Sequence, residues 1–299
     1  MATQANAQVM LGRRGRLELD EVLAALIVDG RIAAEDARKL RQTARPQRTV
    51  RNAIELHPLV LIASAAIEDR AHPGRPLSLE RLSEWLAGHA GLPYLRLDPT
   101  RIEVAQVTQI VSQAYAQRHR ILPVKVAADA VSFATAEPFD AAWARDLAQM
   151  LRRDVLRVVA NPLEIHRYIG QFYGMQRSVQ LARDAGSDTA LSGILNFEQL
   201  VELGKGGELG ADDRHVVNIV DWLLQYAFEQ RASDIHLEPR REMGRVRFRI
   251  DGLLHGVYEL PPTVQAAVTA RVKILARMDV AERRRPQDGR IKTRSAGGR

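Results

Sequence analysis

Apolar residues recur at helical spacing in short blocks over the first part of the chain, and each block ends at a turn signal. Residues 17–43 fit two short helices that break at Asp29-Gly30. A second helical pair follows, in which Ser78 is the predicted N-cap of the second helix. Beyond it, short apolar runs alternate with helical stretches, as in a small α/β unit. The expected elements are helices at 58–69, 79–90, 101–119, 140–152 and 162–173, and strands at 94–97, 121–126 and 130–134.

The last part of the chain repeats the change from helical to strand spacing. A helix with an apolar stripe from Val216 to Ala227 should begin at a cap, Asp212 or Asp213. Strands at 233–237, 245–250 and 253–259 follow, and the Asp251-Gly252 dipeptide between the last two is a hairpin signal. We expect a helix from Pro261-Pro262, an extended basic loop at 283–288 and a final strand at 290–292.

The composition divides the chain into four parts. Residues 1–54 form a helical arm and linker, and 55–174 form a small α/β domain. Residues 175–211 contain glycine-rich loop sequence and read as a flexible linker, and 212–299 form a second domain of sheet and helix. We therefore expect a mixed α/β (α+β) fold with two domains.

The stretch 245–250 alternates arginine with apolar residues, which is the pattern of a half-buried strand. Its apolar members should face a core, and Arg245, Arg247 and Arg249 should line the other face at intervals of roughly 7 Å. A row of fixed cations needs an anion, and phosphate is a usual partner of arginine. A solvated strand face and a nucleic-acid-binding face are the alternatives.

Positive charge is concentrated near the C-terminal end. The whole chain has a net charge of +7, whereas residues 240–299 hold 15 Lys and Arg against 6 Asp and Glu, a net charge of +9. The remaining residues hold 28 basic against 30 acidic side chains, so the basicity marks a local site. Phe248 should point to the face opposite the arginines, and Tyr258 is the only other aromatic residue in 240–299, so we expect no nucleic-acid partner.

Several classes of site do not fit this sequence. It has no cysteine, which excludes disulfides and thiolate sites, and its eight histidines show no zinc-site spacing, so we expect no metal site. Lys205 is followed by glycine and not by the Ser or Thr of a Walker-type loop. His236 and Asp234 share an expected strand face, where a hydrogen bond between them would be a structural polar pair. The longest apolar run, 58–67, is too short to span a bilayer.

The stretch 231–290 resembles the GspE/PilB family, the secretion ATPases of type II secretion systems and type IV pilus assembly. The matching segments are Ala232-Ser-Asp-Ile-His-Leu-Glu-Pro, Val246-Arg-Phe-Arg-Ile-Asp-Gly, Ala270-Arg-Val-Lys-Ile, Met278-Asp-Val-Ala-Glu-Arg-Arg and Arg285-Pro-Gln-Asp-Gly-Arg. Their order is similar to that of the family's second N-terminal domain, a PAS-like unit that precedes a RecA-like motor. A weaker resemblance links 17–174 to the family's first, MshEN-like N-terminal domain through His57-Pro-Leu, Gly91-Leu-Pro-Tyr, Arg120-Ile-Leu-Pro-Val and Ile169-Gly-Gln-Phe-Tyr-Gly.

The resemblance implies the fold and the limits of the chain. A helical MshEN-like domain should be followed by a PAS-like sheet-and-helix domain, and the sequence stops before the RecA-like motor. The family's Walker loop, acidic and histidine boxes and tetracysteine zinc motif have no match in it. We therefore expect the N-terminal portion of a longer ATPase, incomplete at its C-terminal end, that does not hydrolyse ATP alone.

The resemblance also implies the site. Members of the family are hexamers, and the full-length protein would bind ATP and Mg²⁺, with neither bound by this chain alone. Arginines of the second domain lie near the nucleotide phosphates, and Arg247 and Arg249 match that catalytic role by motif. Arg271 and Arg290 are the further candidates for nucleotide binding.

Partners and location follow from the same resemblance. The first domain would dock inner-membrane platform proteins of the secretion or pilus machine, and the protein would be cytoplasmic and peripheral to that membrane. The alternative is a non-enzymatic regulatory or adaptor module that docks the platform and binds cyclic di-GMP. The family's Arg-Leu-Gly motif for that ligand is altered here, because Arg16-Leu17 is followed by Glu18.

Overall fold

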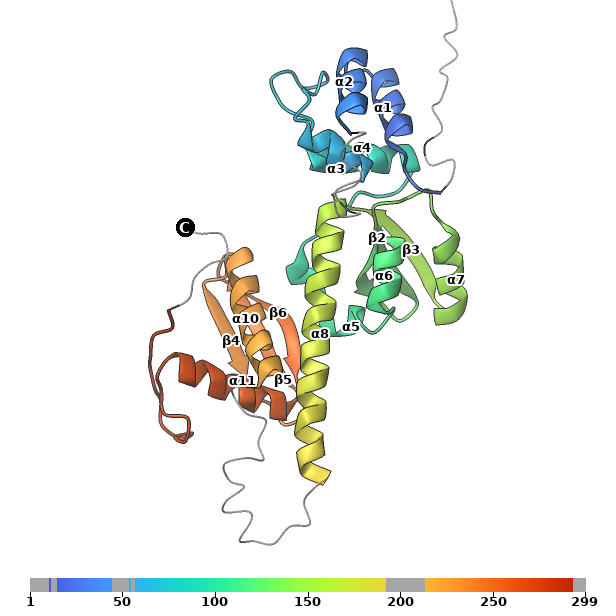
Figure 1. Cartoon of the computed structure of the whole chain (residues 1–299). Helices are drawn as coiled ribbons and strands as arrows, with labels where there is room; N and C mark the ends of the chain where they lie inside the picture. Colours follow the sequence, from blue (N-terminus) through green and yellow to red (C-terminus); the bar gives the residue numbers. More distant parts are fainter. Residues whose placement is uncertain (1–10, 12–14, 45–53, 55–56, 192–212, 293–299) are drawn as a thin grey trace, which may run out of the picture. The chain divides into compact units, whose positions relative to one another are not determined.

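The computed structural model describes residues 11, 15–44, 54, 57–191 and 213–292 (Figure 1). These residues form helices and two three-stranded sheets, which confirms the α+β class expected from the sequence. The chain divides into two compact units, called unit 1 (Met1–Asp98 with Ile110–Gly170) and unit 2 (Pro99–Gln109 with Gln171–Arg299).

The helices and strands follow one another in the order that Figure 1 labels. The helices of unit 1 are α1 (Leu19–Val28), α2 (Ala34–Ala44), α3 (Pro58–Ser64), α4 (Leu79–Ala90), α6 (Gln113–His119) and α7 (Ala142–Leu151), and α8 (Pro162–Leu191) begins there. Its strands are β1 (Ile121–Val126), β2 (Ala130–Thr135) and β3 (Asp154–Val159). Unit 2 contains the short helices η2 (Pro99–Arg101) and α5 (Val104–Val107), then α10 (Arg214–Glu229), β4 (Asp234–Glu238), β5 (Gly244–Ile250), β6 (Leu253–Leu260) and α11 (Pro262–Leu275).

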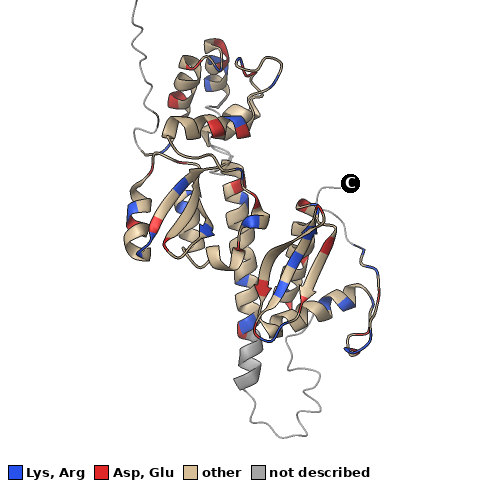
Figure 2. Ribbon diagram, turned by 180° about the vertical axis from the view of Figure 1, so that it is seen from behind, with Lys and Arg blue, Asp and Glu red and all other residues tan. Residues whose placement is uncertain are grey.

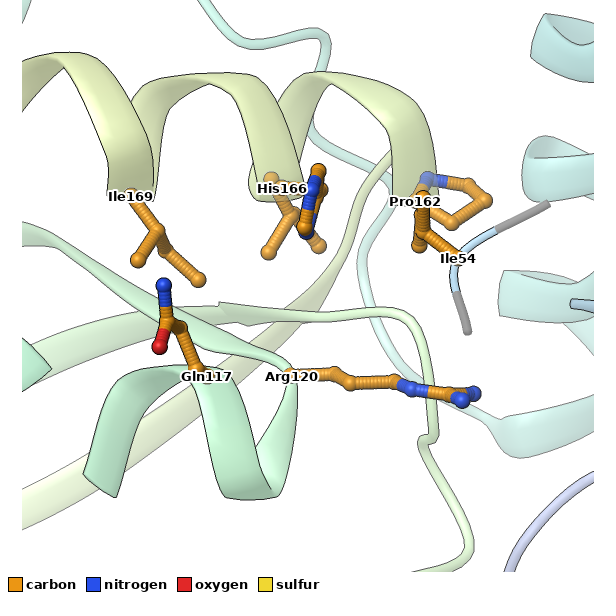
Figure 3. A pocket seen from close by; sticks show the side chains of 7 residues that line it. Ile54, Gln117, Arg120, Pro162, His166 and Ile169 are labelled. Carbon is orange, nitrogen blue, oxygen red and sulfur yellow. The ribbon is translucent and has the colours of Figure 1, made fainter. Parts of the chain in front are cut away.

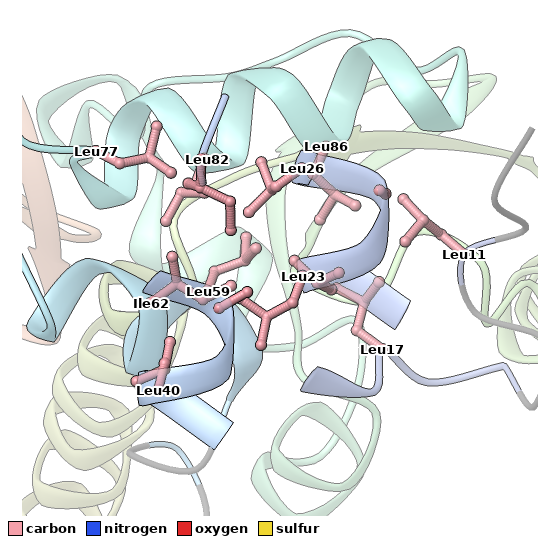
Figure 4. Close-up of a cluster of buried hydrophobic side chains, with 14 of the residues drawn as sticks. Leu11, Leu17, Leu23, Leu26, Leu40, Leu59, Ile62, Leu77, Leu82 and Leu86 are labelled. Carbon is pink, nitrogen blue, oxygen red and sulfur yellow. The ribbon is translucent and has the colours of Figure 1, made fainter. Parts of the chain in front are cut away.

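The helical part of unit 1 is held by leucines that point from α1, α3 and α4 into one cluster (Figure 4). Leu23, Leu26, Leu59, Leu82 and Leu86 are each fully buried there. Helix α4 begins and ends where the sequence predicts. The Ser78 side chain accepts the N–H of Arg81 at its start, and Gly91 ends the helix with a φ of 62°.

The sheet of unit 1 has the order β1-β2-β3, with β1 antiparallel and β3 parallel to β2. The apolar alternation of β2 buries Phe133, whose ring meets that of Trp143 on α7 edge to face at 5.5 Å. The sequence did not predict β3. It also predicted a strand at 94–97, where only Tyr94 pairs, in an isolated bridge with Val159.

Two predicted helices differ from the structure because local features interrupt them. The helix expected at 58–69 ends at Ser64, since Ala66 takes a left-handed φ of 49°. The helix expected at 101–119 is instead η2, α5 and α6, because the Ser112 side chain accepts the N–H of Tyr115 and begins a new helix. Helix α8 continues to Leu191, well past the residue 173 at which the pattern predicted its end.

A buried histidine joins the helices of unit 1 to its sheet. His57 caps α3, where its Nδ1 accepts the N–H of Leu59 at 3.3 Å and its Nε2 donates to the Ala136 carbonyl at 3.3 Å. Both bonds require a neutral ring with its proton on Nε2. Burial, together with the guanidinium of Arg120, lowers the pKa of His57 to about 3, so the ring stays neutral in the folded protein.

The depressed pKa of His57 predicts an acid-sensitive fold. The unfolded chain takes up a proton at this ring near its ordinary pKa of 6.5 while the folded chain does not, so stability is lost as the pH falls from 6.5 towards 3. Between pH 7 and pH 5 this residue should account for about 2 kcal/mol of lost stability. Urea titrations at the two pH values should show a smaller difference in His57→Asn.

The comparison with His57→Asn isolates the histidine from its neighbour Glu137. That carboxyl remains in both proteins, and its pKa is raised by burial, so its own contribution to the pH dependence has the opposite sign. Identical pH dependence in the two proteins would contradict the assignment to His57.

Unit 2 is an antiparallel meander with the order β4-β5-β6. Helix α10 begins at the predicted cap, where the Asp213 carboxylate accepts the N–H of His215 at 2.7 Å. Asp251 and Gly252 have φ values of 49° and 82°, and two positive values are what a tight hairpin turn of this kind requires. The predicted Asp-Gly hairpin is therefore confirmed. Residues 290–292, which the sequence assigned to a strand, have no strand structure.

The core of unit 2 lies between the helices and the apolar face of the sheet. Phe248 of β5 is fully buried, and its ring centroid lies 5.7 Å from that of Tyr226 on α10. Phe172 of α8 meets the same tyrosine edge to face at 6.5 Å. Val264 and Val268 place the buried side of α11 in this core. One face of the sheet is thus fixed by packing, which leaves the other face for polar side chains.

Candidate functional site: the arginine face of β5

Strand β5 presents its arginines on the face that does not carry the core. Val246 and Phe248 are buried, at 1% and 0% exposure, whereas Arg245 is exposed and Arg247 and Arg249 are about one-third exposed. This alternation confirms the predicted row of arginines. Figure 2, which views the chain from behind, shows blue and red segments together on these strands. The acidic segments are the feature that the sequence pattern did not predict.

Arg249 is held on all three of its nitrogen atoms. Its Nε donates to Asp234 Oδ2 at 3.1 Å, its Nη1 donates to the Gly252 carbonyl at 3.2 Å, and its Nη2 lies 3.5 Å from His236 Nε2. The register of the sheet sets Asp234 directly opposite Arg249. The sequence allowed a hydrogen bond between His236 and Asp234, and in the structure the guanidinium of Arg249 contacts both side chains instead.

Arg247 has a different arrangement. Its Nε donates to Glu238 Oε1 at 2.9 Å, and its Nη2 donates to the same oxygen. The hydrogen bond from Arg247 lowers the pKa of the Glu238 carboxyl, which is therefore ionised at neutral pH. Arg245 completes the row, with its Nε 3.5 Å from Glu259 Oε1. Each arginine of the face thus has a carboxylate neighbour inside unit 2.

The other two candidate residues lie on separate elements. Arg271 is half-buried on α11, and Arg290 is exposed after the basic loop. The structure therefore brings Arg247 and Arg249 together on one strand face and sets Arg271 and Arg290 elsewhere in unit 2. Their predicted roles in nucleotide binding stay predictions.

The basic loop between α11 and Arg290 has an ordered interior. Lys273 Nζ and Gln287 Nε2 both donate to the carbonyl oxygens of Asp279 and Glu282. The Asp279 carboxylate accepts backbone N–H groups of the turn, and the Glu282 carboxylate accepts those of the next residues, 284 and 285. These two acidic side chains thus bind the backbone of the loop.

The end of the basic loop folds back on its start. A Cβ on Gly289 would lie 2.4 Å from the carbonyl oxygen of Ala276, closer than any real side chain can approach. Glycine is therefore required at this position by close contact between two parts of the backbone. The sequence pattern treated the loop as extended and did not predict this closure.

Unit 1 contains a cavity of about 420 Å³ between α6 and α8 (Figure 3). Apolar side chains of Pro162, Ile165 and Ile169 line it, together with polar groups of Gln117, Arg120 and His166. Its volume is within the range of small-molecule pockets. The Arg120 guanidinium also forms an ion pair with the buried carboxylate of Glu137 at 2.5 Å, so that this cation serves the fold of unit 1.

Neither a metal centre nor a membrane span is found in the described part of the chain. No group of three or more His, Cys, Asp or Glu side chains among the described residues could hold a metal ion. In the same residues, every helix is either too short or too polar to pass through a bilayer.

Comparison with known proteins gives two family matches. Residues 210–299 match the family model described as type II/IV secretion system protein, and residues 90–179 match the MshEN domain. The chain is 41% identical over 278 residues to the type IV pilus assembly ATPase TfpB of Acinetobacter baylyi, which covers 92% of the chain and 46% of that protein. It is 32% identical over 241 residues to the pilus assembly ATPase PilB of Myxococcus xanthus, covering 80% of the chain and 40% of that protein.

The chain is also similar to a type II secretion protein and to a solved structure. The type II secretion system protein E of Xanthomonas campestris is 32% identical over 219 residues, covering 72% of the chain and 37% of that protein. A match with a solved structure, MshE with cdg, covers 53% of the chain and 100% of that structure at 18% identity, with a TM-score of 0.34. The chain spans less than half the length of the three curated relatives.

Proposed function

The chain belongs to the family of type II secretion and type IV pilus assembly ATPases, and from this membership we propose that it supplies the N-terminal domains of a hexameric ATPase that powers pseudopilus or pilus assembly. The observation that carries the proposal is the 41% identity to a pilus assembly ATPase across 92% of the chain. A match of that extent includes both units and the segment that joins them.

Unit 2 would contribute positive charge to the ATP site. ATP and Mg²⁺ would be bound by the full-length protein, and the arginine face of β5 would approach the nucleotide phosphates. Guanidinium groups suit this role because their planar donors match the phosphoryl oxygens. Donors that are held in place before reaction stabilise the charge that develops on the phosphoryl group. The contacts of Arg249 support the proposal in one respect, because they tie β4 and the hairpin turn to the face on which Arg247 lies.

Unit 1 would serve as the docking domain. Members of the family act with secretion or pilus machinery. We propose that unit 1 binds inner-membrane platform proteins of that machinery and thereby holds a cytoplasmic ATPase at the membrane. The MshEN match at 90–179 supports a role separate from the motor, since it covers the whole sheet of unit 1.

The alternative is a regulatory module that binds cyclic di-GMP without acting in ATP hydrolysis. Calorimetry with the purified chain distinguishes the two, because our proposal requires no saturable binding of cyclic di-GMP. A micromolar dissociation constant would favour the regulatory module.

A chimera tests the proposed function. We expect the purified chain to show no ATP turnover above background, because its Gly-Lys-Gly segment at Lys205, which lies outside the described residues, lacks the features of a Walker loop. In the chimera, this chain replaces the matching region of the A. baylyi ATPase. The chimera should hydrolyse ATP and restore pilus assembly in a strain without the ATPase. Turnover by the chain alone that is lost in Lys205→Ala would contradict the proposal, and so would an inactive but folded chimera.

A further inference from the structure

We propose that Glu238 is an internal counter-anion that occupies the phosphate-binding edge of Arg247 until ATP displaces it, and that Arg249 is a positioning residue and not a phosphate contact. The inference rests on the proposed function, because it concerns the same face of β5. It assigns separate roles to two arginines that are alike in sequence pattern. The two residues differ in the donors that each guanidinium has engaged.

Arg249 has no nitrogen that is unengaged. Its contacts reach Asp234 and His236 on β4 and the carbonyl of Gly252 in the hairpin turn. A phosphate could take the Nε–Nη2 edge of Arg249 only by displacing Asp234 and His236 from it, and Nη1 already donates to the Gly252 carbonyl. The direct cross-strand pairing with Asp234 also fixes this arginine by the register of the sheet. Arg249 therefore braces β4 against the hairpin that ends β5.

Arg247 is engaged less completely. Both of its engaged nitrogens, Nε and Nη2, donate to one oxygen of Glu238, and no partner of its Nη1 is found among the described residues. Glu238 lies opposite Arg245 in the register and reaches Arg247 diagonally. The residues directly opposite Arg247 are His236 and Gly256. This ion pair is consequently not fixed by the sheet in the way that the pair of Arg249 is.

Gly256 leaves space beside Arg247. A Cβ at this position would meet nothing within 4 Å, and the glycine is exposed. The neighbours on β6 differ for the other arginines, since Leu254 stands opposite Arg249 and Glu259 stands opposite Arg245. Of the three positions in the row, Arg247 alone has no side chain opposite it on β6. A phosphate group can approach its guanidinium from that side.

Glu238 has a second cation available when it leaves Arg247. Arg240 Nη2 lies 3.7 Å from Glu238 Oε2, so a small rotation of the carboxylate can retain one ion pair. The side chains of Glu238 and Arg247 are 25% and 34% exposed, and ion pairs with that degree of solvent contact contribute little net stability. A nucleotide phosphate carries more negative charge than one carboxylate and offers two oxygens to the guanidinium fork. Exchange of Glu238 for phosphate is therefore favourable.

Steady-state ATP hydrolysis by the complete ATPase that contains this chain tests the inference. Glu238→Gln removes the competing charge, so the KM for ATP should fall about two- to five-fold with kcat unchanged. The matched control is Glu259→Gln, which removes the carboxylate beside Arg245 on the same face and should leave KM unchanged. Arg247→Ala should lower kcat/KM by about 10²-fold without changing the melting temperature, and Arg247→Lys should restore only part of it.

Arg249 is tested through stability and kinetics together. Arg249→Ala and Asp234→Asn should both lower the melting temperature of the protein, and Arg249→Ala should lower it more, because it also removes the contacts with Gly252 and His236. A rise in KM or a loss of kcat in Glu238→Gln would overturn the inference, and so would kinetic losses in Arg249→Ala at an unchanged melting temperature. Unchanged kinetics in both Arg247→Ala and Arg249→Ala would instead refute the contact between this face and ATP in the proposed function.

Discussion

Replacing Asp69 with alanine should lower the free energy of unfolding of unit 1 by about 3–5 kcal/mol. The side chain is fully buried and accepts two hydrogen bonds from Arg31, from Nε and Nη2, both at 2.9 Å. Arg81 Nη1 lies 3.6 Å from the same carboxylate, so one buried anion serves two guanidinium groups. Its removal leaves both cations without that counter-charge at a site with little access to water.

The Asp69 carboxyl is held in its ionised form, which agrees with this expectation. Burial by itself would raise the pKa of this carboxyl, but hydrogen bonds from His72 and Arg31 outweigh burial, and its pKa lies below the ordinary value. The carboxylate also connects the turn after α1, through Arg31, to the segment between α3 and α4. Its loss should therefore loosen both helical pairs at once.

Urea denaturation followed by circular dichroism measures the effect. The matched control is Asp20→Ala, which removes an exposed carboxylate that binds Arg41 at 2.7 Å in the same helical region. Because that pair is exposed, its loss should cost at most about 1 kcal/mol. Equal effects of the two substitutions would show that the Asp69 pair contributes no more than a surface ion pair.

The second large effect is expected at Phe248. Phe248→Ala should lower the free energy of unfolding of unit 2 by about 3–5 kcal/mol, because the ring is fully buried on β5 and packs against Tyr226. The surrounding helix and strand cannot collapse fully into the space that the ring leaves. Leu253→Ala is the control, since this leucine on β6 is 68% exposed and its truncation should change stability by less than about 0.5 kcal/mol.

Hydrogen exchange of backbone amides in β5 and α10 gives a measurement that is specific to unit 2. Phe248→Ala should accelerate exchange in both elements, and Leu253→Ala should leave it unchanged. If both variants retained the exchange protection of the parent protein, Phe248 would not be the centre of the core of unit 2.

The hairpin of β5 and β6 could be predicted because its signals act over a few residues. Alternation fixed which side chains of β5 face the core, and the Asp251-Gly252 dipeptide fixed the turn. The N-caps Ser78 and Asp213 were predictable for the same reason, since a cap binds a backbone N–H only two or three residues away.

The carboxylates of the candidate site could not be predicted with the same rules. Arg249 and Asp234 are 15 residues apart, and their contact depends on the register between two strands. The sequence placed Asp234 and His236 on one face of β4 but contained no local signal for the arginine that binds them. The row of arginines therefore predicted an external anion without showing that internal anions were present.

The interrupted helix of residues 101–119 shows how short polar side chains limit prediction from spacing. Its apolar residues fit a helical period, but the hydroxyl of Ser112 binds the backbone and begins α6. Thr108 also bonds within the chain, donating to the carbonyl of Val104 at 2.7 Å. Such hydroxyl groups can support a helix or end it, and the packing of the unit decides which occurs.

The closed basic loop separates the shape of this segment from its charge. The backbone path of the loop is determined by the close contact of Gly289 with the backbone of Ala276. It is also determined by the hydrogen bonds that Lys273 and Gln287 donate to carbonyl groups of the loop. The side chains of Arg284 and Arg285 are exposed and take no part in those bonds. Evolution or an engineer could therefore change the electrostatic potential of the loop one arginine at a time while its geometry persisted. In this segment of the chain, positive charge and architecture can be varied independently.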